Sequence, residues 1–430
     1  MENVQHVDVI RKHRAADQAL PEEIAVSLRE IVSDAKRGLL ALSVDVGLQV
    51  FKAMMTEEMT AVVGEKGKHN QDRTAKRHGD EYGSVVLGGR RVRVRRPRAR
   101  TTDGHEVGLG TYDAFQDPEM LGSLAFERMV AGLSTRRYDV GLEPVGDVDG
   151  RGTSKAAVSR RFVAQTSKAL RQLMSKDLRD TRFVVLFLDG VELAEHCCVV
   201  ALGVDDQGGK HPLALRQGTT ENAGVCRALL SDLVERGLSF DDGILVIIDG
   251  GKGLRKAVRQ VFGALAAVQR CQIHKRRNVL DHLPQHLRAT VGKQLDKAWR
   301  DEDAKRSKRS LEALASNLER EHPGAASSIR EGLDETLTVN RLALPDSLRR
   351  SFRSTNAVES MISVGREVTR NVKRWRDGKM VERWTAAGMV VAQRQFRRVN
   401  GHRDMHVLIA ALKQHAKGTS VQEAMLQESA

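Results

Sequence analysis

The sequence has few cysteines and no apolar run long enough to cross a membrane. Four cysteines in 430 residues do not indicate a disulfide framework. The longest apolar runs, residues 183–188 and 244–248, have the length of a strand, whereas a membrane helix needs about 20 apolar residues. The first residues also lack the apolar core of a secretory signal. These absences lead us to expect a cytoplasmic protein without a membrane partner.

The charge of the chain is basic and unevenly distributed. Seventy Lys and Arg residues against 56 Asp and Glu residues give a net charge of +14. Residues 181–250 hold five basic and eleven acidic residues, so this stretch is −6 and the rest of the chain is +20. A basic body around an acidic middle suits a protein that binds a polyanion and gathers divalent cations at one place. An ordinary solvated surface is the alternative.

The N-terminal part has a helical pattern that gives way to an arginine-rich hairpin. Residues 21–63 space their apolar side chains as helices do, and we expect residues 1–80 to form a helical region for DNA binding or dimerisation. The polar residues 64–83 predict a loop. Two valines, a Gly-Gly turn and alternating arginine and valine then predict a β-hairpin with one charged face over residues 84–95.

Arginine dominates the second strand of this hairpin. No acidic residue occurs among residues 90–100, so these cations would repel one another unless phosphate groups lay between them. DNA-backbone contact is therefore the stronger hypothesis, and a charged edge strand that only prevents aggregation is the alternative. The candidates for DNA contact are Arg90, Arg91, Arg93, Arg95, Arg96, Arg98 and Arg100.

The rest of a predicted DNA-binding region, residues 81–180, resembles a helix-turn-helix. Residues 118–145 hold two short helical patterns, and a glycine-rich linker, residues 146–152, precedes a further helix. Ser154 or Thr153 can cap that helix. Its early turns carry the candidates for major-groove contact, Lys155, Arg160 and Arg161. A pair of helices without DNA contact is the alternative.

From residue 181 the pattern changes to apolar runs separated by turn residues. Strands are expected at residues 183–189, 197–204, 211–218, 244–249 and 267–273, with helices after the third and fourth. This order predicts a mixed α/β sheet of five strands. The expected regions are the first part of this core at 181–280, an all-α insertion at 281–350, the last part of the core at 351–400 and a helical tail at 401–430.

Three carboxylates stand out by their positions. Asp189 and Asp249 each end an apolar strand and precede glycine, which alone would fit an ordinary Asp-Gly turn. Both strands should lie centrally in one sheet, and sites in open α/β sheets form at the carboxyl ends of strands. Glu359 begins a late helix, where Asn356 as N-cap would make it part of a capping box. Together the three acids indicate a site.

Such a site needs cations. Two unit charges about 4 Å apart repel by roughly 4 kcal/mol at an effective dielectric near 20, so three converging carboxylates would be destabilising alone. All-oxygen ligation favours Mg²⁺, with Mn²⁺ as a substitute, over zinc. Two such ions would serve in-line phosphoryl transfer.

Residues 270–279 hold a further group of candidates. Cys271 and His274 have the spacing of metal ligands, and Cys197 with Cys198 would complete a zinc site, but no second CxxC or HxxxH pair is present. The stronger hypothesis is a packed cysteine and a histidine near the carboxylates, followed by cations that face phosphates, Lys275, Arg276 and Arg277. The expected supporting residues are Cys271, His274, Arg277, Asn278 and Asn356.

Four segments in this order, FLDG, IIDGGKGLRKAV, QRCQIHKRRNV and RSTNAVES, resemble bacterial insertion-sequence transposases of the Mutator type. The resemblance runs from about residue 80 to 395. It implies an RNase H-like catalytic domain with a helical insertion before the last acid, and a metal-binding triad of Asp189, Asp249 and Glu359. Cys271 and His274 match the family's Cys-x-x-His signature. Relatives usually follow the first acid with an aromatic and basic residues, where this chain has residues 191–193, VEL, so local substrate contacts differ.

The resemblance also implies a reaction and its partners. Such a protein binds terminal inverted repeats and target DNA, generates 3′-hydroxyl ends and transfers them, with Mg²⁺, within a homodimer or larger homo-oligomer. An RNase H-like nuclease or resolvase that only hydrolyses DNA is the second hypothesis, and a non-catalytic DNA-binding regulator is the third. Trp299 in the insertion is expected in the core, with stacking on an unpaired base as the alternative.

Overall fold

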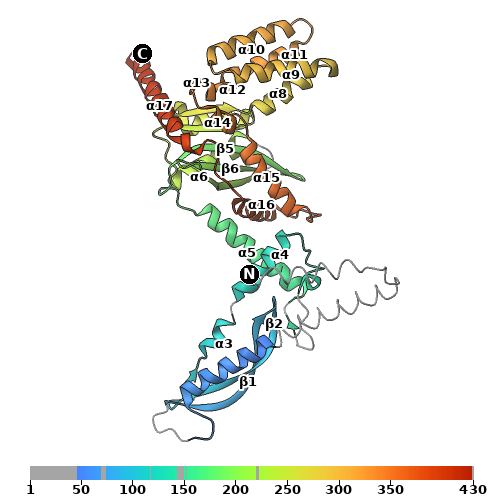
Figure 1. Ribbon diagram of the computed structural model, residues 1–430, viewed down its shortest axis with the longest axis vertical. Coiled ribbons are helices and arrows are strands. Elements are labelled where there is room, and N and C mark those ends of the chain that lie inside the picture. Colours follow the sequence, from blue (N-terminus) through green and yellow to red (C-terminus); the bar gives the residue numbers. More distant parts are fainter. Residues whose placement is uncertain are drawn as a thin grey trace, which may run out of the picture. The chain divides into compact units, whose positions relative to one another are not determined.

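The structure is a computed structural model that describes residues 46–68, 74–116, 118–142, 150–151, 153–218 and 222–428. The chain divides into two units, each described by itself (Figure 1). One comprises the residues up to Arg128 together with Leu133–Phe162, and the other comprises Met129–Gly132 together with Val163–Ala430. Of the helical region predicted over residues 21–63, residues 21–45 lie outside the described residues.

The first unit is built on a long β-hairpin. β1 (Ala75–Leu87) pairs antiparallel with β2 (Arg90–Thr101), and Val85 lies opposite Val92. The hairpin is longer than predicted, because residues 75–83 belong to β1 and not to a loop. A helix over residues 46–63 adds Phe51, Met55 and Met59 to the hairpin's apolar core. These three positions recur every four residues, so they share one face of the helix.

Short strands and helices complete this unit. β3 (Glu106–Val107) and β4 (Gly150–Arg151) both pair with β2. The described residues between β3 and β4 form α3 (Gly110–Ala114), α4 (Pro118–Val130) and the 3₁₀ turn η1 (Asp139–Gly141). The Ser154 hydroxyl caps the next helix, α5 (Lys155–Met174), by accepting a hydrogen bond from the backbone N–H of Ala157. The expected tight turn between two helices is not found in the described residues: residues 131–154 separate α4 from α5 in the chain, and the described part of this stretch holds the 3₁₀ turn η1.

The second unit contains the mixed five-stranded sheet that the sequence predicts. Its order is β7-β6-β5-β8-β9, with antiparallel pairing from β7 to β5 and parallel pairing from β5 to β9. The strands are β5 (Phe183–Leu193), β6 (His196–Asp205), β7 (Lys210–Gly218), β8 (Ile244–Ile248) and β9 (Ala266–Arg270). The β5–β6 hairpin extends both strands beyond the runs expected from apolar residues alone.

Successive side chains of the central strands point to opposite faces of the sheet and pack into two separate hydrophobic cores. In β8, Leu245 and Ile247 belong to one core, while Ile244, Val246 and Ile248 belong to the other. Helices α6 (Ala223–Glu235) and α7 (Lys252–Phe262) contribute to the second core. The first core is covered by α15 (Asn356–Thr369), α16 (Gly378–Gln393) and α17 (Met405–Glu428). Burying each aliphatic side chain contributes about 1.5–3 kcal/mol, so the sheet is stabilised from both faces.

A helical insertion with a core of its own follows β9. Its helices are α8 (Gln272–Asp281), α9 (Gln285–Arg300), α10 (Ala304–Leu318), α11 (Pro323–Arg330), α12 (Leu333–Thr336), α13 (Thr338–Arg341) and α14 (Asp346–Phe352). Trp299 is buried in this core, and its indole N–H donates to the Thr336 hydroxyl at 3.2 Å. The core position predicted for Trp299 is therefore confirmed. Among the described residues, no helix is both long and apolar enough to span a membrane.

Candidate active site

Asp189 and Asp249 lie close together on neighbouring parallel strands. Asp249 directly follows β8, but Asp189 lies within β5, so the expectation that Asp189 ends its strand is wrong. Phe187 of β5 pairs with Ile247 of β8, and each aspartate lies two residues beyond its member of that pair. Parallel strands lie about 4.8 Å apart, so the two acids begin from adjacent positions. Residues two apart share a face, and both Phe187 and Ile247 belong to the core under α15. Both aspartates therefore point toward the face that α15 covers.

The surroundings of Asp189 disfavour its negative charge. Burial raises the pKa of this carboxyl, and the nearby charge of Asp249 raises it further, to about 7. The backbone N–H of Gly190 donates to Asp189 Oδ1 at 2.9 Å and offsets part of this cost. At Asp249 the backbone N–H of Gly251 donates to Oδ1 at 2.8 Å. The raised pKa of Asp189 thus reflects its burial first and the nearby carboxylate of Asp249 second.

Glu359 reaches the same face from the first turns of α15. The helix begins at Asn356, so Thr355 and not Asn356 is the N-cap, and the predicted capping box is wrong. The buried Thr355 hydroxyl donates to Glu359 Oε1, one turn along the helix. Asn356 itself is exposed. Glu359 contributes to the raised pKa of Asp189, as expected for a third carboxylate close to the pair.

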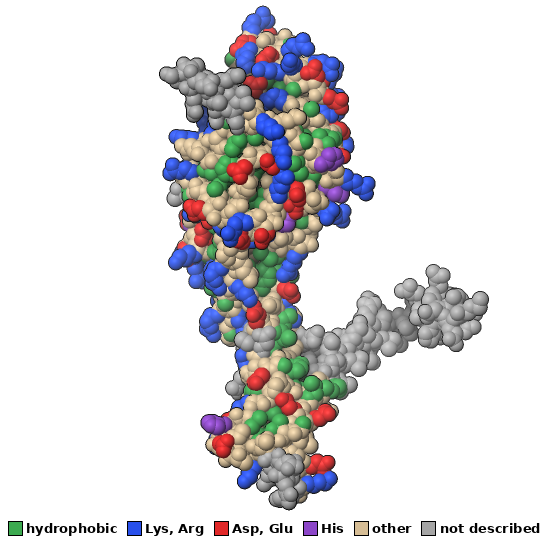
Figure 2. Space-filling view, turned by 90° about the vertical axis from the view of Figure 1, so that its left-hand side faces the viewer, with side chains coloured by type: hydrophobic (Ala, Val, Ile, Leu, Met, Phe, Trp, Pro, Cys, Tyr) green, Lys and Arg blue, Asp and Glu red, His purple; other side chains and the backbone are tan. Residues whose placement is uncertain are grey.

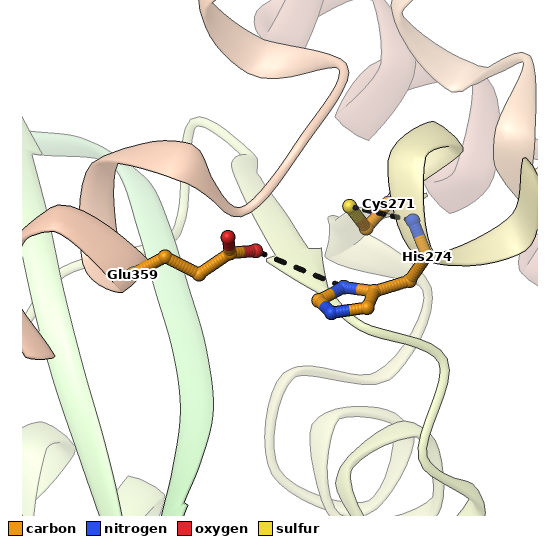
Figure 3. Close-up of side chains that lie close together, drawn as sticks. All are labelled: Cys271, His274 and Glu359. Atoms are coloured by element: carbon orange, nitrogen blue, oxygen red, sulfur yellow. Dashed lines mark hydrogen bonds and ion pairs between the residues drawn. The ribbon is translucent and has the colours of Figure 1, made fainter. Parts of the chain in front are cut away.

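Cys271 and His274 lie beside Glu359 at the start of α8 (Figure 3). Cys271 is the N-cap of that helix and is fully buried, and its backbone N–H donates to the carbonyl oxygen of Ile248 at 2.8 Å. The ring Nδ1 of His274 lies 3.8 Å from Glu359 Oε1. The Thr355 hydroxyl lies 3.3 Å from Cys271 Sγ and 3.4 Å from the His274 ring. This arrangement confirms that the pair lies near Glu359.

The pair is polarised toward a thiolate and an imidazolium. Burial raises the pKa of the Cys271 thiol, but hydrogen bonds from His274 and Thr355 outweigh it and hold the pKa below its ordinary value. The hydrogen bond with Cys271 raises the pKa of His274, and the charges of Cys271, Glu359 and Asp189 add to this, giving about 9. His274 therefore supplies positive charge next to the carboxylates at neutral pH.

The zinc alternative that included Cys197 and Cys198 is wrong. Both lie on β6, and neither belongs to the group of side chains that lies around Cys271 and His274. Within the part of the chain that the structure describes, the His, Cys, Asp and Glu groups close enough to hold one ion are those of Cys271, His274 and Glu359.

The cations that follow His274 do not all face outward. Lys275 is 1% exposed, and its ammonium group donates to the carbonyl oxygen of Ser328 at 2.8 Å and pairs with Glu331 at 3.3 Å. The expectation that Lys275 faces phosphate is therefore wrong. Arg276 is half-buried and pairs with Asp296. The remaining candidates, Arg277 and Asn278, are exposed and lie one turn from His274 on α8.

Comparison with known proteins places this geometry in a family. The model of the Mutator family of transposases matches residues 22–398. The chain belongs to this family. It is 30% identical over 249 residues to the transposase of insertion sequence IS6120 from Mycolicibacterium smegmatis, covering 56% of this chain and 75% of that protein. It is 26% identical over 343 residues to the transposase of ISRM5 from Rhizobium meliloti, covering 78% and 83%. Transposases are DNA-processing enzymes, which assigns the chain to that general class.

The arginines of this transposase have acidic neighbours that the sequence of β2 does not show. Asp80 pairs with Arg95 at 3.4 Å, and Glu106 pairs with Arg98 at 2.7 Å. Glu81 pairs with Arg96 and lies 3.3 Å from Arg98. The expectation of an arginine cluster without acidic partners is thus corrected. In an antiparallel hairpin, partners come from the opposite strand and not from sequence neighbours.

The other predicted DNA-contact residues differ in exposure. Arg93 is exposed, and its guanidinium lies 4.0 Å from the centre of the exposed Tyr82 ring. Arg90, Arg91 and Arg100 are half-buried, and Arg91 donates to the Ser84 hydroxyl at 3.2 Å. On α5, Lys155 and Arg160 are exposed and Arg161 is half-buried. Figure 2 shows basic side chains spread over one face of the molecule with acidic ones between them, and not one continuous basic field.

Two residues of the site region were missed by sequence reasoning. Thr355 precedes the helix and holds Glu359, and a Thr four residues before a candidate Glu is the only signal that the sequence offers for it. Arg270 is 6% exposed, and it bonds both the loop after Asp249 and the helical insertion. Its neighbours Gln269 and Cys271 are uncharged, and the sequence held no signal for this inward role.

Proposed function

We propose that this transposase cleaves DNA at the ends of its insertion sequence and joins the freed 3′ ends to target DNA. Asp189, Asp249 and Glu359 are the catalytic carboxylates in this proposal. The observation that carries it is the pairing of β5 with β8, which brings the two aspartates together on the face covered by the helix of Glu359. The family membership supports the same reading.

We further propose an RNase H-like catalytic core. Three antiparallel strands followed by two parallel strands, with one acid within β5 and one directly after β8, agree with the arrangement that the sequence resemblance implies. The third acid follows a helical insertion that leaves the sheet after β9 and returns at α15. The insertion therefore separates Glu359 from the two aspartates in sequence, while α15 packs on the core to which Phe187 and Ile247 belong.

The carboxylates fit Mg²⁺, with Mn²⁺ as a substitute and two ions in each site. Their donors are all oxygen, which suits hard divalent cations. Burial and the neighbouring charge of Asp249 raise the pKa of Asp189, and this supports a site in which cations balance the acids. Bound ions would neutralise the acids and stabilise the charge that develops on phosphate oxygens during in-line transfer.

The protein's own contribution is to hold the acids in place. The sheet fixes the backbone of Asp189, and Gly251 orients the Asp249 carboxylate through its N–H. Thr355 fixes one oxygen of Glu359 and leaves the other oxygen available. Such preorganisation lowers the cost of assembling the reactive geometry.

DNA is the proposed partner for the exposed cations. Arg93 on the hairpin, Lys155 and Arg160 on α5, and Arg277 on α8 are exposed and suit phosphate contact. The proposed ligands are the terminal inverted repeats and the target DNA. The active complex is proposed to be a homodimer or a larger homo-oligomer that acts on chromosomal DNA in the cytoplasm.

A strand-transfer assay tests the proposed function. Precut ends of the element, incubated with the protein and Mg²⁺, should join to a target plasmid. Asp249→Asn should abolish joining while end binding stays nearly unchanged. Hydrolysis without joining would favour a nuclease or resolvase, and end binding without cleavage would favour a regulator. Either result would overturn the proposal.

A further inference from the structure

A second group of metal-binding side chains lies beside the three carboxylates and includes one of them. Cys271 offers a sulfur, His274 a ring nitrogen and Glu359 an oxygen, and these atoms lie within 4.8 Å of one another. Figure 3 shows the Glu359 carboxylate pointing from α15 toward the His274 ring, with Cys271 at the first turn of α8 behind it. Asp189 and Asp249 are not members of this group.

We propose that Cys271, His274 and Glu359 bind a thiophilic divalent cation of the Zn²⁺ class, and that the bound ion inhibits the enzyme by withdrawing Glu359 from the two aspartates. The inhibitory half rests on the proposed function, because it requires Glu359 to act with Asp189 and Asp249. The binding half does not depend on any activity.

The chemistry of the donors selects the ion. Thiolate and imidazole are the ligands that Zn²⁺ prefers, whereas Mg²⁺ prefers oxygen. In this proposal the Cys271–His274 pair forms a site for Zn²⁺, the two aspartates form a site for Mg²⁺, and both sites use Glu359. Three protein ligands with a fourth position open to solvent are typical of accessible zinc sites. Here the His274 and Glu359 side chains are 25% and 39% exposed, so an ion can enter from their side.

The surroundings of Cys271 are suited to a metal-bound thiolate. The backbone N–H groups of His274 and Thr355 both lie 3.5 Å from Cys271 Sγ and donate to it. The sulfur also lies at the N-terminus of α8, where the helix dipole favours negative charge. These interactions fix the orientation of the Cys271 side chain, as hydrogen bonds to a metal ligand commonly do.

Binding requires a small local rearrangement. The Thr355 hydroxyl now donates to Glu359 and lies between the sulfur and the carboxylate. The ion would replace this hydrogen bond, and the protons of the thiol and of the imidazolium would pass to solvent. Because Glu359 Oε1 already lies beside His274, a bound ion would hold the carboxylate on this side and prevent it from acting with the aspartates.

Co²⁺ is a suitable probe, because it takes the place of Zn²⁺ and its absorption reports thiolate coordination. The reduced, metal-free full chain is titrated with Co²⁺, and bound Co²⁺ is then displaced with Zn²⁺. The wild type should show one thiolate–Co²⁺ band that Zn²⁺ removes. The double variant Asp189→Asn with Asp249→Asn should keep the band, since it changes only the other site. Cys271→Ser should lose the band, while Cys226→Ser, at another fully buried cysteine, should keep it.

Glu359→Gln tests whether the carboxylate is shared. Its Co²⁺ affinity should fall by at least about 10–100-fold. That is the loss typical when a residue that hydrogen-bonds to a metal ligand is removed, and here the ligand itself is changed. Unchanged affinity in this variant would overturn the inhibitory half, and absence of the band in the wild type would overturn the whole inference. Failure of strand transfer with a normal Co²⁺ spectrum would instead count against the proposed function alone.

Discussion

Arg270 donates a hydrogen bond from Nη2 to the carbonyl oxygen of Gly250 at 3.0 Å, directly after Asp249. Its Nη1 donates at 3.0 Å to the carbonyl oxygen of Glu331 in the helical insertion. Gly250 has a φ of +112°, and a Cβ at this position would collide with the Arg270 guanidinium. Arg270 thus joins the loop that carries one candidate metal ligand to the insertion, through contacts that only a forked side chain can make at once.

Arg270→Lys should raise the Mg²⁺ concentration required for cleavage and lower the maximal rate. A lysine can keep one of the two carbonyl contacts but not both, so the Asp249 loop becomes less restrained. The expected loss is about 10–100-fold, as for partners that orient metal ligands. The measurement is a Mg²⁺ titration of cleavage at fixed DNA, together with the thermal stability of the same protein.

Arg236→Lys is the matched control for this variant. Arg236 also donates to two carbonyl oxygens, those of Leu213 at 2.9 Å and Leu173 at 3.0 Å, but at a place without candidate ligands. It should lower stability without changing the Mg²⁺ requirement. If both variants show the wild-type Mg²⁺ dependence, Arg270 has a structural role only.

Glu359→Gln should leave the fold intact and stop DNA cleavage. Glutamine can still accept the hydrogen bond from Thr355, so the free energy of unfolding should change by less than about 1 kcal/mol. Loss of one charged ligand should cost several kcal/mol of transition-state stabilisation, on the order of a thousandfold in rate. Glu367→Gln, an exposed position on the same helix, should cleave normally. Equal activity of the two variants would remove Glu359 from the mechanism.

The sheet and its two aspartates could be predicted because local patterns determine them. Buried strands such as β8 are continuous apolar runs, and an acid directly after such a run lies at the end of the sheet where sites form. The start of β1 could not be predicted in this way. Its first residues are polar and include Gly79, and they form a strand only because β2 pairs with them. Long-range pairing decided the structure there.

In the candidate site, too, some features follow from local sequence patterns and others depend on the folded structure. Glu359 was found from its place after the insertion, whereas its partner Thr355 depends on where the helix begins, which sequence patterns locate to within a few residues. The prediction for Lys275 was wrong because a run of basic residues usually marks a helix face that is exposed to solvent. Its helical spacing with Gln272 and Val279, both buried, was the signal that pointed inward.

Lys275→Met should destabilise the protein without affecting its affinity for DNA. The variant removes the ammonium group that bonds Ser328 and Glu331 and leaves a buried carbonyl without that donor, at a cost of about 1–3 kcal/mol. Arg277→Ala, on the exposed side of the same helix, should weaken DNA binding with unchanged stability. Denaturant unfolding and a binding titration distinguish the two effects. Weaker DNA binding by a fully folded Lys275→Met protein would contradict the assignment.

Arg93 and Arg98 lie on one strand but should have opposite roles. Arg98 is held by Glu81 and Glu106, so its charge is already compensated, whereas Arg93 is exposed and packs on the Tyr82 ring. Arg93→Ala should weaken DNA binding and reduce the slope of log affinity against log salt by about one, because one phosphate contact is lost. Arg98→Ala should leave that slope unchanged and lower hairpin stability only slightly, because exposed ion pairs contribute little. A reduced slope in Arg98→Ala, with a normal slope in Arg93→Ala, would show that DNA displaces the acids and binds the paired arginines instead.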